Sequence, residues 1–271
     1  MFVVFLLFIL GDWTLSKGAP APISKEIFVN PQGGPGVYTR IQDAINQGVP
    51  GNNNGWVLIN VAPGLIGPWV RACRENVTVP PDKPYVYLKG HQKSTTIVAW
   101  RTSGWNLWEA TLMVLADNFI AQRITFKNTF NLDGGNVVKP AVAVSVHGDK
   151  NSFYRCAFIG VQDTLFDATG RHFFRSCYIE GAVDFIFGTG TSQYQACTIN
   201  ATGYGFITAQ NRDTPDGPSG FVFKFTRVIG NGPTYLGRAY GPYSRVLFYK
   251  STLPGCVEPK GWDPWHFVGH E

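Results

Sequence analysis

Three short segments repeat in the middle of the chain: Phe153-Tyr154-Arg155-Cys156-Ala157-Phe158-Ile159, Phe174-Arg175-Ser176-Cys177-Tyr178-Ile179 and Tyr194-Gln195-Ala196-Cys197-Thr198-Ile199. Their cysteines are 21 residues (156 to 177) and 20 residues (177 to 197) apart. A second set of segments follows them in turn: Asp163-Thr164-Leu165-Phe166, Asp184-Phe185-Ile186-Phe187 and Phe206-Ile207-Thr208-Ala209. Each repeat therefore holds at least two short strands, separated by turns that contain Gly.

Short strands at this interval can form a sandwich, a barrel or a parallel β-helix. Equivalent residues recur in the same order in every repeat, whereas hairpins would reverse the order in alternate strands. The pattern therefore favours an all-β parallel β-helix built of stacked coils. Apolar runs at 57–61, 86–88 and 121–126 have the composition of further strands, and residues 41–45 are expected to form a short N-terminal capping helix.

The five cysteines, at positions 73, 156, 177, 197 and 256, form no C-x-x-C pair with metal spacing. Stacked coils would place Cys156, Cys177 and Cys197 above one another, about 4.8 Å apart. We expect a buried ladder of thiols, and a disulfide between neighbouring coils is the alternative.

The composition excludes several classes of protein. The 271 residues include 23 Lys and Arg against 18 Asp and Glu, a net charge of +5, and only 15% are charged while 44% are hydrophobic. A chain this apolar can bury a core, so intrinsic disorder is excluded. The basic residues are scattered along the sequence without a nucleic-acid-binding motif, so the charge hints only at acidic partners.

The N-terminus predicts export. Residues 2–10 form an apolar block too short to span a membrane, and small residues follow it, as in a secretory signal peptide. We expect a signal peptide at 1–22, a single domain at 24–271 and a secreted protein without a membrane span. The sequons at Asn76 and Asn200 permit glycosylation.

The repeat places Asp163 and Asp184 one coil apart in equivalent positions. Two carboxyl groups this close do not both ionise readily, so their pKa values should separate into one proton-bearing acid and one anion. That division suits general acid catalysis combined with nucleophilic attack. The alternative is that both are turn residues that hydrogen-bond to the backbone, and the spacing does not separate the two.

Three longer strings carry a family resemblance: 160–166 (Gly-Val-Gln-Asp-Thr-Leu-Phe), 181–188 (Gly-Ala-Val-Asp-Phe-Ile-Phe-Gly) and 235–246, which contains Leu236-Gly237-Arg238-Ala239-Tyr240-Gly241. Together with flanking strings at 38–45, 61–64, 117–121 and 206–210, they resemble the signature segments of plant pectinesterases, or pectin methylesterases, over about residues 25–265. The resemblance implies a right-handed, single-stranded, pectin-lyase-like β-helix and hydrolysis of the C6 methyl esters of homogalacturonan in the cell wall.

By this resemblance Asp184 matches the nucleophile, Asp163 the proton donor and base, Gln162 a donor to the oxyanion, and Arg238 the residue that pairs with the nucleophile. The substrate-binding positions are Thr111, Arg238, Tyr240 and Phe187, with Phe166 and Val183 as expected neighbours. No metal or organic cofactor is implied. The implied partner is pectin, a proteinaceous pectinesterase inhibitor is a second, and the chain is expected to act as a monomer without nucleic acid.

Four features depart from the family pattern. Pro140 stands where a second oxyanion Gln is usual, and Tyr240 stands where Trp is common. Residues 65–74 form an insertion. The chain ends at Glu271, earlier than is usual, which predicts a shortened domain. Loss of one oxyanion donor typically costs about 100- to 1000-fold in rate. The alternative function is therefore a catalytically impaired pectin-binding homologue. A pectic lyase or polygalacturonase ranks last, because their carboxylate and His motifs are missing.

Overall fold

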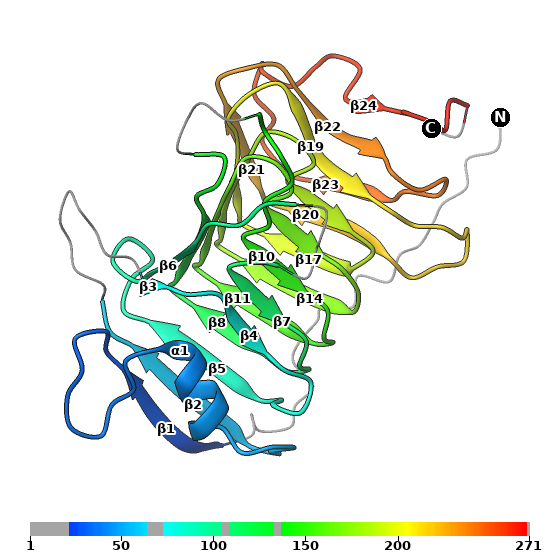
Figure 1. Ribbon diagram of the computed structural model, residues 1–271. Coiled ribbons are helices and arrows are strands. Elements are labelled where there is room, and N and C mark those ends of the chain that lie inside the picture. The colour runs from blue at the N-terminus through cyan, green and yellow to red at the C-terminus, as the bar shows by residue number, and fades with distance from the viewer. Residues whose placement is uncertain (1–21, 64–72, 105–108, 133–136, 270–271) are drawn as a thin grey trace.

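The protein is a stack of coils in which three sheets run the length of the molecule. The computed structural model describes residues 22–63, 73–104, 109–132 and 137–269 (Figure 1). All paired strands in these ranges are parallel, and from β2 onward the chain passes from the nine-stranded sheet A to the seven-stranded sheet B to the eight-stranded sheet C. This architecture is a right-handed parallel β-helix, so the predicted fold class is confirmed.

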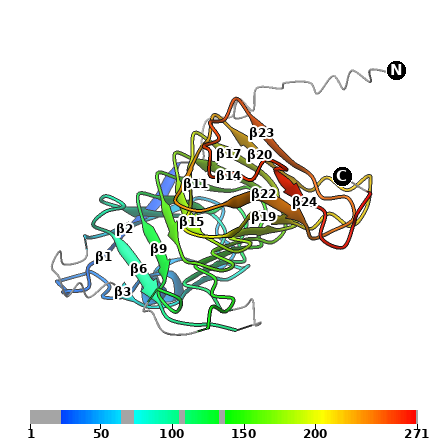
Figure 2. The same ribbon diagram turned by 90° about the horizontal axis from the view of Figure 1, so that it is seen from above.

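Sheet A consists of β1 (Ile23–Val29), β2 (Trp56–Val61), β5 (Val86–Gly90), β8 (Ile120–Gln122), β11 (Asn151–Tyr154), β14 (Arg171–Arg175), β17 (Thr191–Gln195), β20 (Gly220–Lys224) and β23 (Val246–Tyr249). Sheet B consists of β3 (Cys73–Arg74), β6 (Ile97–Trp100), β9 (Thr125–Asn128), β12 (Ala157–Ile159), β15 (Tyr178–Gly181), β18 (Thr198–Ala201) and β21 (Arg227–Gly230), and several of its strands lie side by side in Figure 2. Sheet C consists of β4 (Val77–Val79), β7 (Leu112–Val114), β10 (Val144–Val146), β13 (Leu165–Asp167), β16 (Ile186–Gly188), β19 (Gly205–Gln210), β22 (Thr234–Ala239) and β24 (Trp262–Asp263).

Each full coil has three strands, one more than the two that the repeat required. The run at 121–126, expected as one strand, is divided between β8 and β9. The chain turns there because Arg123 has φ 59°, in the left-handed region that ends a strand. Such corners are short, and the strands on either side have similar composition, so propensity does not separate them.

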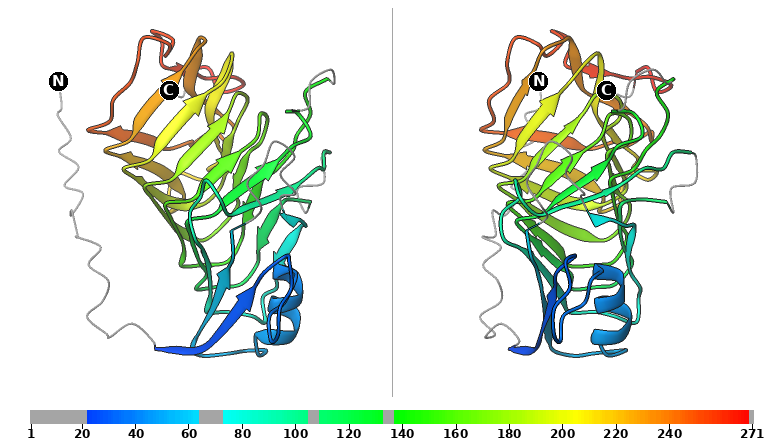
Figure 3. Two further views of the ribbon diagram at one scale, coloured as in Figure 1. Left: turned by 90° about the vertical axis from the view of Figure 1, so that its left-hand side faces the viewer. Right: turned by 60° about the vertical axis from the view of Figure 1, so that its left-hand side comes forward.

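A short helix covers the N-terminal end of the stack, as predicted. It runs through α1 (Ile41–Asp43) and the wider turn η1 (Ala44–Gly48), and Figure 3 shows it beside the first strands. Ile41, Ala44 and Ile45 are fully buried in the core, which fixes the face that the helix turns inward. Its first turn is held by the buried carboxylate of Glu75, which accepts hydrogen bonds from the backbone N–H groups of Ile41 (2.9 Å) and Gln42 (3.2 Å).

The core is a set of ladders in which the same position of successive coils carries similar side chains. Phe153, Phe174, Tyr194, Phe223 and Phe248 are in register, and their neighbouring rings stack with centroids 4.4–5.1 Å apart. This close ring contact adds to the burial of large apolar surface.

The thiols of Cys156, Cys177 and Cys197 form the predicted buried ladder and are free, so the disulfide alternative is excluded for these three. Burial raises the pKa of Cys177 well above its usual range. These cysteines therefore act as small apolar core residues. The insertion at 65–74 lies outside the described residues except for β3, as does nearly all of the predicted signal peptide.

The predictions that the chain lacks a membrane span and carries two glycosylation sequons both concern export. No helix in the described part of the chain is long and apolar enough to cross a membrane. Of the two sequons, Asn76 is exposed, whereas the Asn200 amide donates to Tyr178 Oη (2.8 Å) and Glu180 Oε2 (2.9 Å). Asn76 is therefore the more accessible of the two for a glycan.

Candidate active site

The two predicted carboxylates lie at the corner where the chain leaves sheet B and enters sheet C. Asp163 precedes β13, Asp184 precedes β16, and the bridge between Gln162 and Val183 fixes their register in adjacent coils. Both aspartates have left-handed backbones, with φ 60° and 48°, a conformation that Asp tolerates better than most residues. This turn interrupts the alternation of inward-pointing and outward-pointing side chains along the strand. The Asp184 carboxylate contacts Arg238, which lies on the outer face of sheet C.

Arg238 reaches Asp184 from two coils away. It lies on β22, and in the register of sheet C the row Phe166, Phe187, Ala209, Arg238 points outward between core-facing neighbours. Because Ala209 is small, the Arg238 side chain can pass over it. The guanidinium then makes a bidentate contact, with Nε to Asp184 Oδ1 at 2.8 Å and Nη2 to Oδ2.

The two carboxyl groups have unequal environments. Burial, followed by the negative charge of Asp184, raises the pKa of Asp163 to about 7 against the opposing charge of Arg238. Burial also raises the pKa of Asp184, but the hydrogen bonds and the charge of Arg238 act directly against it. The Asp163 carboxyl makes no hydrogen bond to any residue that the structure describes. The geometry therefore favours a proton on Asp163 and a negative charge on Asp184.

Of the two positions where the family has an oxyanion donor, 162 and 140, only Gln162 carries an amide that can donate a hydrogen bond. The Gln162 side chain is half-buried, lies next to Asp163, and is not hydrogen-bonded to any part of the described chain. Its amide is therefore available to a ligand. Pro140 is buried and has no N–H, and its carbonyl accepts a hydrogen bond from the Gly104 N–H at 3.0 Å. The structure thus places one amide donor at this corner and leaves position 140 without one.

Aromatic rings line the outer face of sheet C beside the carboxylates. Phe166 and Phe187 are half-buried and stack on each other with centroids 4.6 Å apart. His147 meets Phe166 edge to face at 5.4 Å, and burial lowers the pKa of His147, which favours the neutral ring. The expected neighbour Val183 is half-buried next to Asp184. Flat, neutral surfaces of this kind suit the apolar faces of a sugar ring.

Two further aromatic residues hold Arg238, and the sequence analysis missed both of these roles. The guanidinium carbon lies 3.8 Å from the ring centroid of Trp265 and 4.6 Å from that of Phe206. The repeat itself could have indicated Phe206, which is one coil beyond Asp184. Trp265 follows the last coil, so no repeat places it. Tyr240 is 48% exposed and its ring is 4.9 Å from Trp265.

The predicted substrate-binding residue Thr111 lies inside the coil. Its side chain is fully buried, and its hydroxyl donates to the backbone carbonyl of Lys127 at 3.1 Å. It therefore supports the wall of the coil and is not brought to the outer face with Asp163, Asp184 and Arg238. The sequence string around Thr111 does not distinguish a threonine that points outward from one that points inward.

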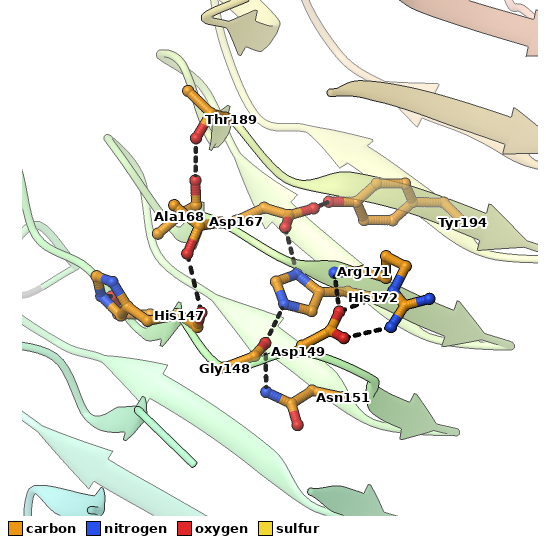
Figure 4. Close-up of polar contacts among 12 residues, drawn as sticks. His147, Gly148, Asp149, Asn151, Asp167, Ala168, Arg171, His172, Thr189 and Tyr194 are labelled. Carbon is orange, nitrogen blue, oxygen red and sulfur yellow. Dashed lines mark hydrogen bonds and ion pairs between the residues drawn. The ribbon is translucent and has the colours of Figure 1, made fainter. Parts of the chain in front are cut away.

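A second charged network lies close by but inside the fold (Figure 4). His172 is fully buried, with Nδ1 2.5 Å from Asp167 Oδ1 and Nε2 2.8 Å from the Gly148 carbonyl oxygen, and Tyr194 Oη donates to Asp167 Oδ2 at 2.6 Å. Both ring nitrogens face acceptors, so the doubly protonated ring satisfies both contacts beside an ionised Asp167. The charge of Asp167 raises the pKa of His172 against the effect of burial.

No group of three or more His, Cys, Asp or Glu residues within the described ranges is placed to hold a metal ion. The arrangement instead provides a carboxylate fixed by a guanidinium, a neighbouring carboxyl group that titrates near neutrality, and one free amide. These are the elements of acyl transfer by a carboxylate nucleophile with general acid–base assistance.

Comparisons with known proteins identify the family of the chain. A family model for pectinesterase matches residues 26–269. "Probable pectinesterase 29" from Arabidopsis thaliana is 45% identical over 259 residues, which cover 91% of this chain and 75% of that protein. The solved pectin methylesterase from carrot is 30% identical, with a TM-score of 0.80 over 92% of this chain and 79% of its own. The pectin methylesterase from Aspergillus niger is 27% identical with a TM-score of 0.75 over 91% and 81% of the two chains. The chain therefore belongs to the pectinesterase family of carboxylic ester hydrolases.

Proposed function

We propose that this protein hydrolyses the C6 methyl esters of galacturonate units in cell-wall pectin, releasing methanol and leaving pectate. The observation that carries the proposal is the unequal carboxyl pair: Asp184 is fixed by Arg238, while Asp163 beside it has a pKa raised to about 7. An unperturbed pair of surface aspartates would both be ionised at neutral pH and would provide no acid.

In the first step, the Asp184 carboxylate oxygen attacks the ester carbonyl carbon. The C–O⁻ group of the tetrahedral intermediate accepts a hydrogen bond from the Gln162 amide. The bond to the methoxy oxygen then breaks as Asp163 transfers its proton to that oxygen, and methanol leaves. The products of this step are an acyl-enzyme on Asp184 and an ionised Asp163.

In the second step, Asp163 accepts a proton from water, and the resulting hydroxide attacks the acyl carbon. The bond to the Asp184 oxygen breaks, which restores that carboxylate and gives the free uronic acid. That acid loses its proton to solvent and becomes negatively charged next to Asp184. Repulsion between the two carboxylates favours release of the product, whereas the neutral ester entered without this cost.

The aromatic face is proposed as the sugar-binding surface. Phe166 and Phe187 form its continuous part, and Tyr240 with Trp265 borders the catalytic pair on the other side. Arg238 then has two roles, in binding and in holding the nucleophile. Secretion into the wall, action as a monomer and capture by a proteinaceous inhibitor remain proposals that follow from the family.

The test is methanol release from highly methylated pectin by the wild type and by Asp184→Asn. The amide cannot act as the nucleophile, so we expect the rate to fall by at least about 1000-fold. Asp213→Asn removes an exposed carboxylate that is not part of the pair and serves as the control. Equal rates for the wild type and Asp184→Asn would exclude the proposed nucleophile.

A second candidate function has one observation in its favour. Position 140 offers neither a side-chain donor nor a backbone N–H, so the oxyanion has one amide fewer than expected. A pectin-binding protein without turnover would bind methylated pectin while releasing methanol no faster than the Asp184→Asn variant does. Measurable release above that background would exclude this candidate.

A further inference from the structure

We infer that the protein has a second polymer-binding site for de-esterified, negatively charged uronate chains, separate from the carboxylate pair. It is a hollow of about 860 Å³ at the corner between sheets A and B. We call its charged part the basic corner and define it as Lys89, Arg123 and Arg155. This inference rests on the proposed function, because that reaction produces the polyanion the site would bind.

The β-helix places the three cations in three consecutive coils. Lys89 on β5 is in register with Gln122 on β8, and Gln122 is in register with Tyr154 on β11. Arg123 and Arg155 directly follow the last two of these, at equivalent corners. Successive coils are about 4.8 Å apart, so the positive charges form a short row. Strand β5, which carries Lys89, and strands β8 and β11, which precede Arg123 and Arg155, lie side by side in the N-terminal half of the stack (Figure 1).

These cations have no acidic partner among the described residues. In the part of the chain that the structure describes, no carboxylate lies within ion-pair distance of Lys89, Arg123 or Arg155. The one carboxylate lining the hollow is Glu26, which already accepts a hydrogen bond from the Asn60 amide at 2.5 Å. The hollow thus has three positive charges against one negative charge.

The turns themselves do not require arginine. Arg123 and Arg155 have φ 59° and 54°, and the same corner in the next two coils is formed by Ser176 and Ala196 at φ 56° and 52°. Small uncharged residues therefore satisfy this backbone. Like charges at the same corner of neighbouring coils repel each other, so the two arginines are unfavourable for the fold alone. A ligand that neutralises them removes that cost.

The chemistry of the corner selects a polycarboxylate. Guanidinium groups bind carboxylates through two parallel hydrogen bonds, and a row of cations matches a polymer that repeats its charge. The hollow lies where the strands of sheet A end, whereas Asp163 and Asp184 lie where the chain enters sheet C. A demethylated chain bound here would keep the enzyme near its product while leaving the carboxylate pair open to the next ester.

The experiment measures the Kd for fully de-esterified polygalacturonate by isothermal titration calorimetry over a salt series. We expect Arg123→Ser/Arg155→Ser to bind about 10-fold more weakly at low salt and to show a shallower salt dependence. Serine already occupies this corner at position 176, which favours folding of the variant. Lys250→Ser is the matched control: Lys250 has the same left-handed corner conformation (φ 46°) but lies outside the hollow.

A Kd for the double variant within twofold of the wild type would overturn the inference. So would an equal loss in Lys250→Ser, which would mean that only net charge matters. The inference would also be contradicted if the double variant bound single-stranded DNA more weakly than the wild type but bound polygalacturonate equally well. The corner would then recognise another class of polymer.

Methanol release from a short methylated oligomer separates this inference from the proposed function. Retained release in the double variant, together with weakened polygalacturonate binding, is the expected result. Loss of binding with no release even from the wild type would support the basic corner while rejecting the proposed function.

Discussion

Two carboxylate–cation pairs have their carboxylates in adjacent coils, and the surroundings of the two pairs are opposite. Asp184 pairs with Arg238 at the surface of sheet C, where the side chains are 7% and 19% exposed. Asp167 pairs with His172 inside the fold, where both side chains are completely buried. Strand β13 connects the two settings, since Asp163 precedes it and Asp167 ends it.

The two pairs differ in whether the polar groups around them all have hydrogen-bond partners. Both oxygens of Asp167 accept hydrogen bonds, from His172 and from Tyr194, so that network is complete without a ligand. Beside Asp184, the carboxyl of Asp163 and the amide of Gln162 have no partner in the described structure, and burial has already raised the pKa of Asp163. A complete buried network stabilises the fold, whereas an incomplete one beside solvent can act on a substrate.

Among variants that leave the proposed nucleophile Asp184 intact, the largest change in rate is expected from Asp163→Asn. The amide cannot give a proton to the leaving methoxide, so kcat should fall by about 100- to 10,000-fold. The pH profile provides a second readout. Because Asp163 must be protonated and its pKa is raised to about 7, wild-type kcat/KM should decline as the pH rises through about 7. A wild-type rate that stays constant from pH 6 to 9 would contradict the role of Asp163 as the acid.

Pro140→Gln tests whether the incomplete site lacks a donor. If the new amide reaches the oxyanion, kcat should increase by about 100-fold with little change in KM, since the contact forms mainly in the transition state. Pro140→Met is the control, because it has a similar length and no donor. Equal increases in the two variants would assign the effect to the loss of proline and not to the amide.

Arg238→Lys keeps the positive charge and removes the bidentate contact. We expect kcat/KM to fall about 10-fold, because a single ammonium fixes the Asp184 carboxylate less firmly. The contacts from Arg238 lower the pKa of Asp184 against the effect of burial, so weakening them should raise that pKa. The ascending limb of the pH profile of kcat/KM should therefore move to higher pH. A lower rate with an unshifted limb would mean that Arg238 only contacts the sugar.

His172→Phe should have the smallest effect on rate and a large effect on stability. It leaves Asp167 buried without its cation, which typically costs about 3–5 kcal/mol of unfolding free energy. At a temperature where the variant stays folded, kcat/KM should remain within about threefold of the wild type. Adding Asp167→Asn should restore part of the stability, because no unpaired buried charge then remains.

The same network predicts a pH dependence with a definite sign. The folded-state pKa of His172 is raised, so its contribution to stability is complete below the unfolded pKa of about 6.5 and is lost as the pH rises through the folded value. The difference in melting temperature between the wild type and His172→Phe should therefore shrink in alkaline solution. A difference that grows with pH would contradict an imidazolium at this position.

The repeat made much of the fold predictable. Phe153, Phe174 and Tyr194 occupy the same place in consecutive coils, and a parallel β-helix has to stack such residues in register, so the sequence spacing carries over directly into the structure. The third strand of each coil was missed because the corners at residues such as Arg123 are single left-handed residues without Gly or Pro. Nothing in local propensity marks such a corner.

For the site, sequence by itself determined the carboxylate pair, because Asp163 and Asp184 are one repeat apart and the period of the coil sets their separation. Their neighbours were decided by the tertiary structure. Arg238 reaches across a whole coil over Ala209, Trp265 arrives from beyond the last repeat, and Thr111 turns into the wall. A periodic backbone fixes which positions lie above one another, but the direction of a side chain and its reach depend on the volumes packed around it.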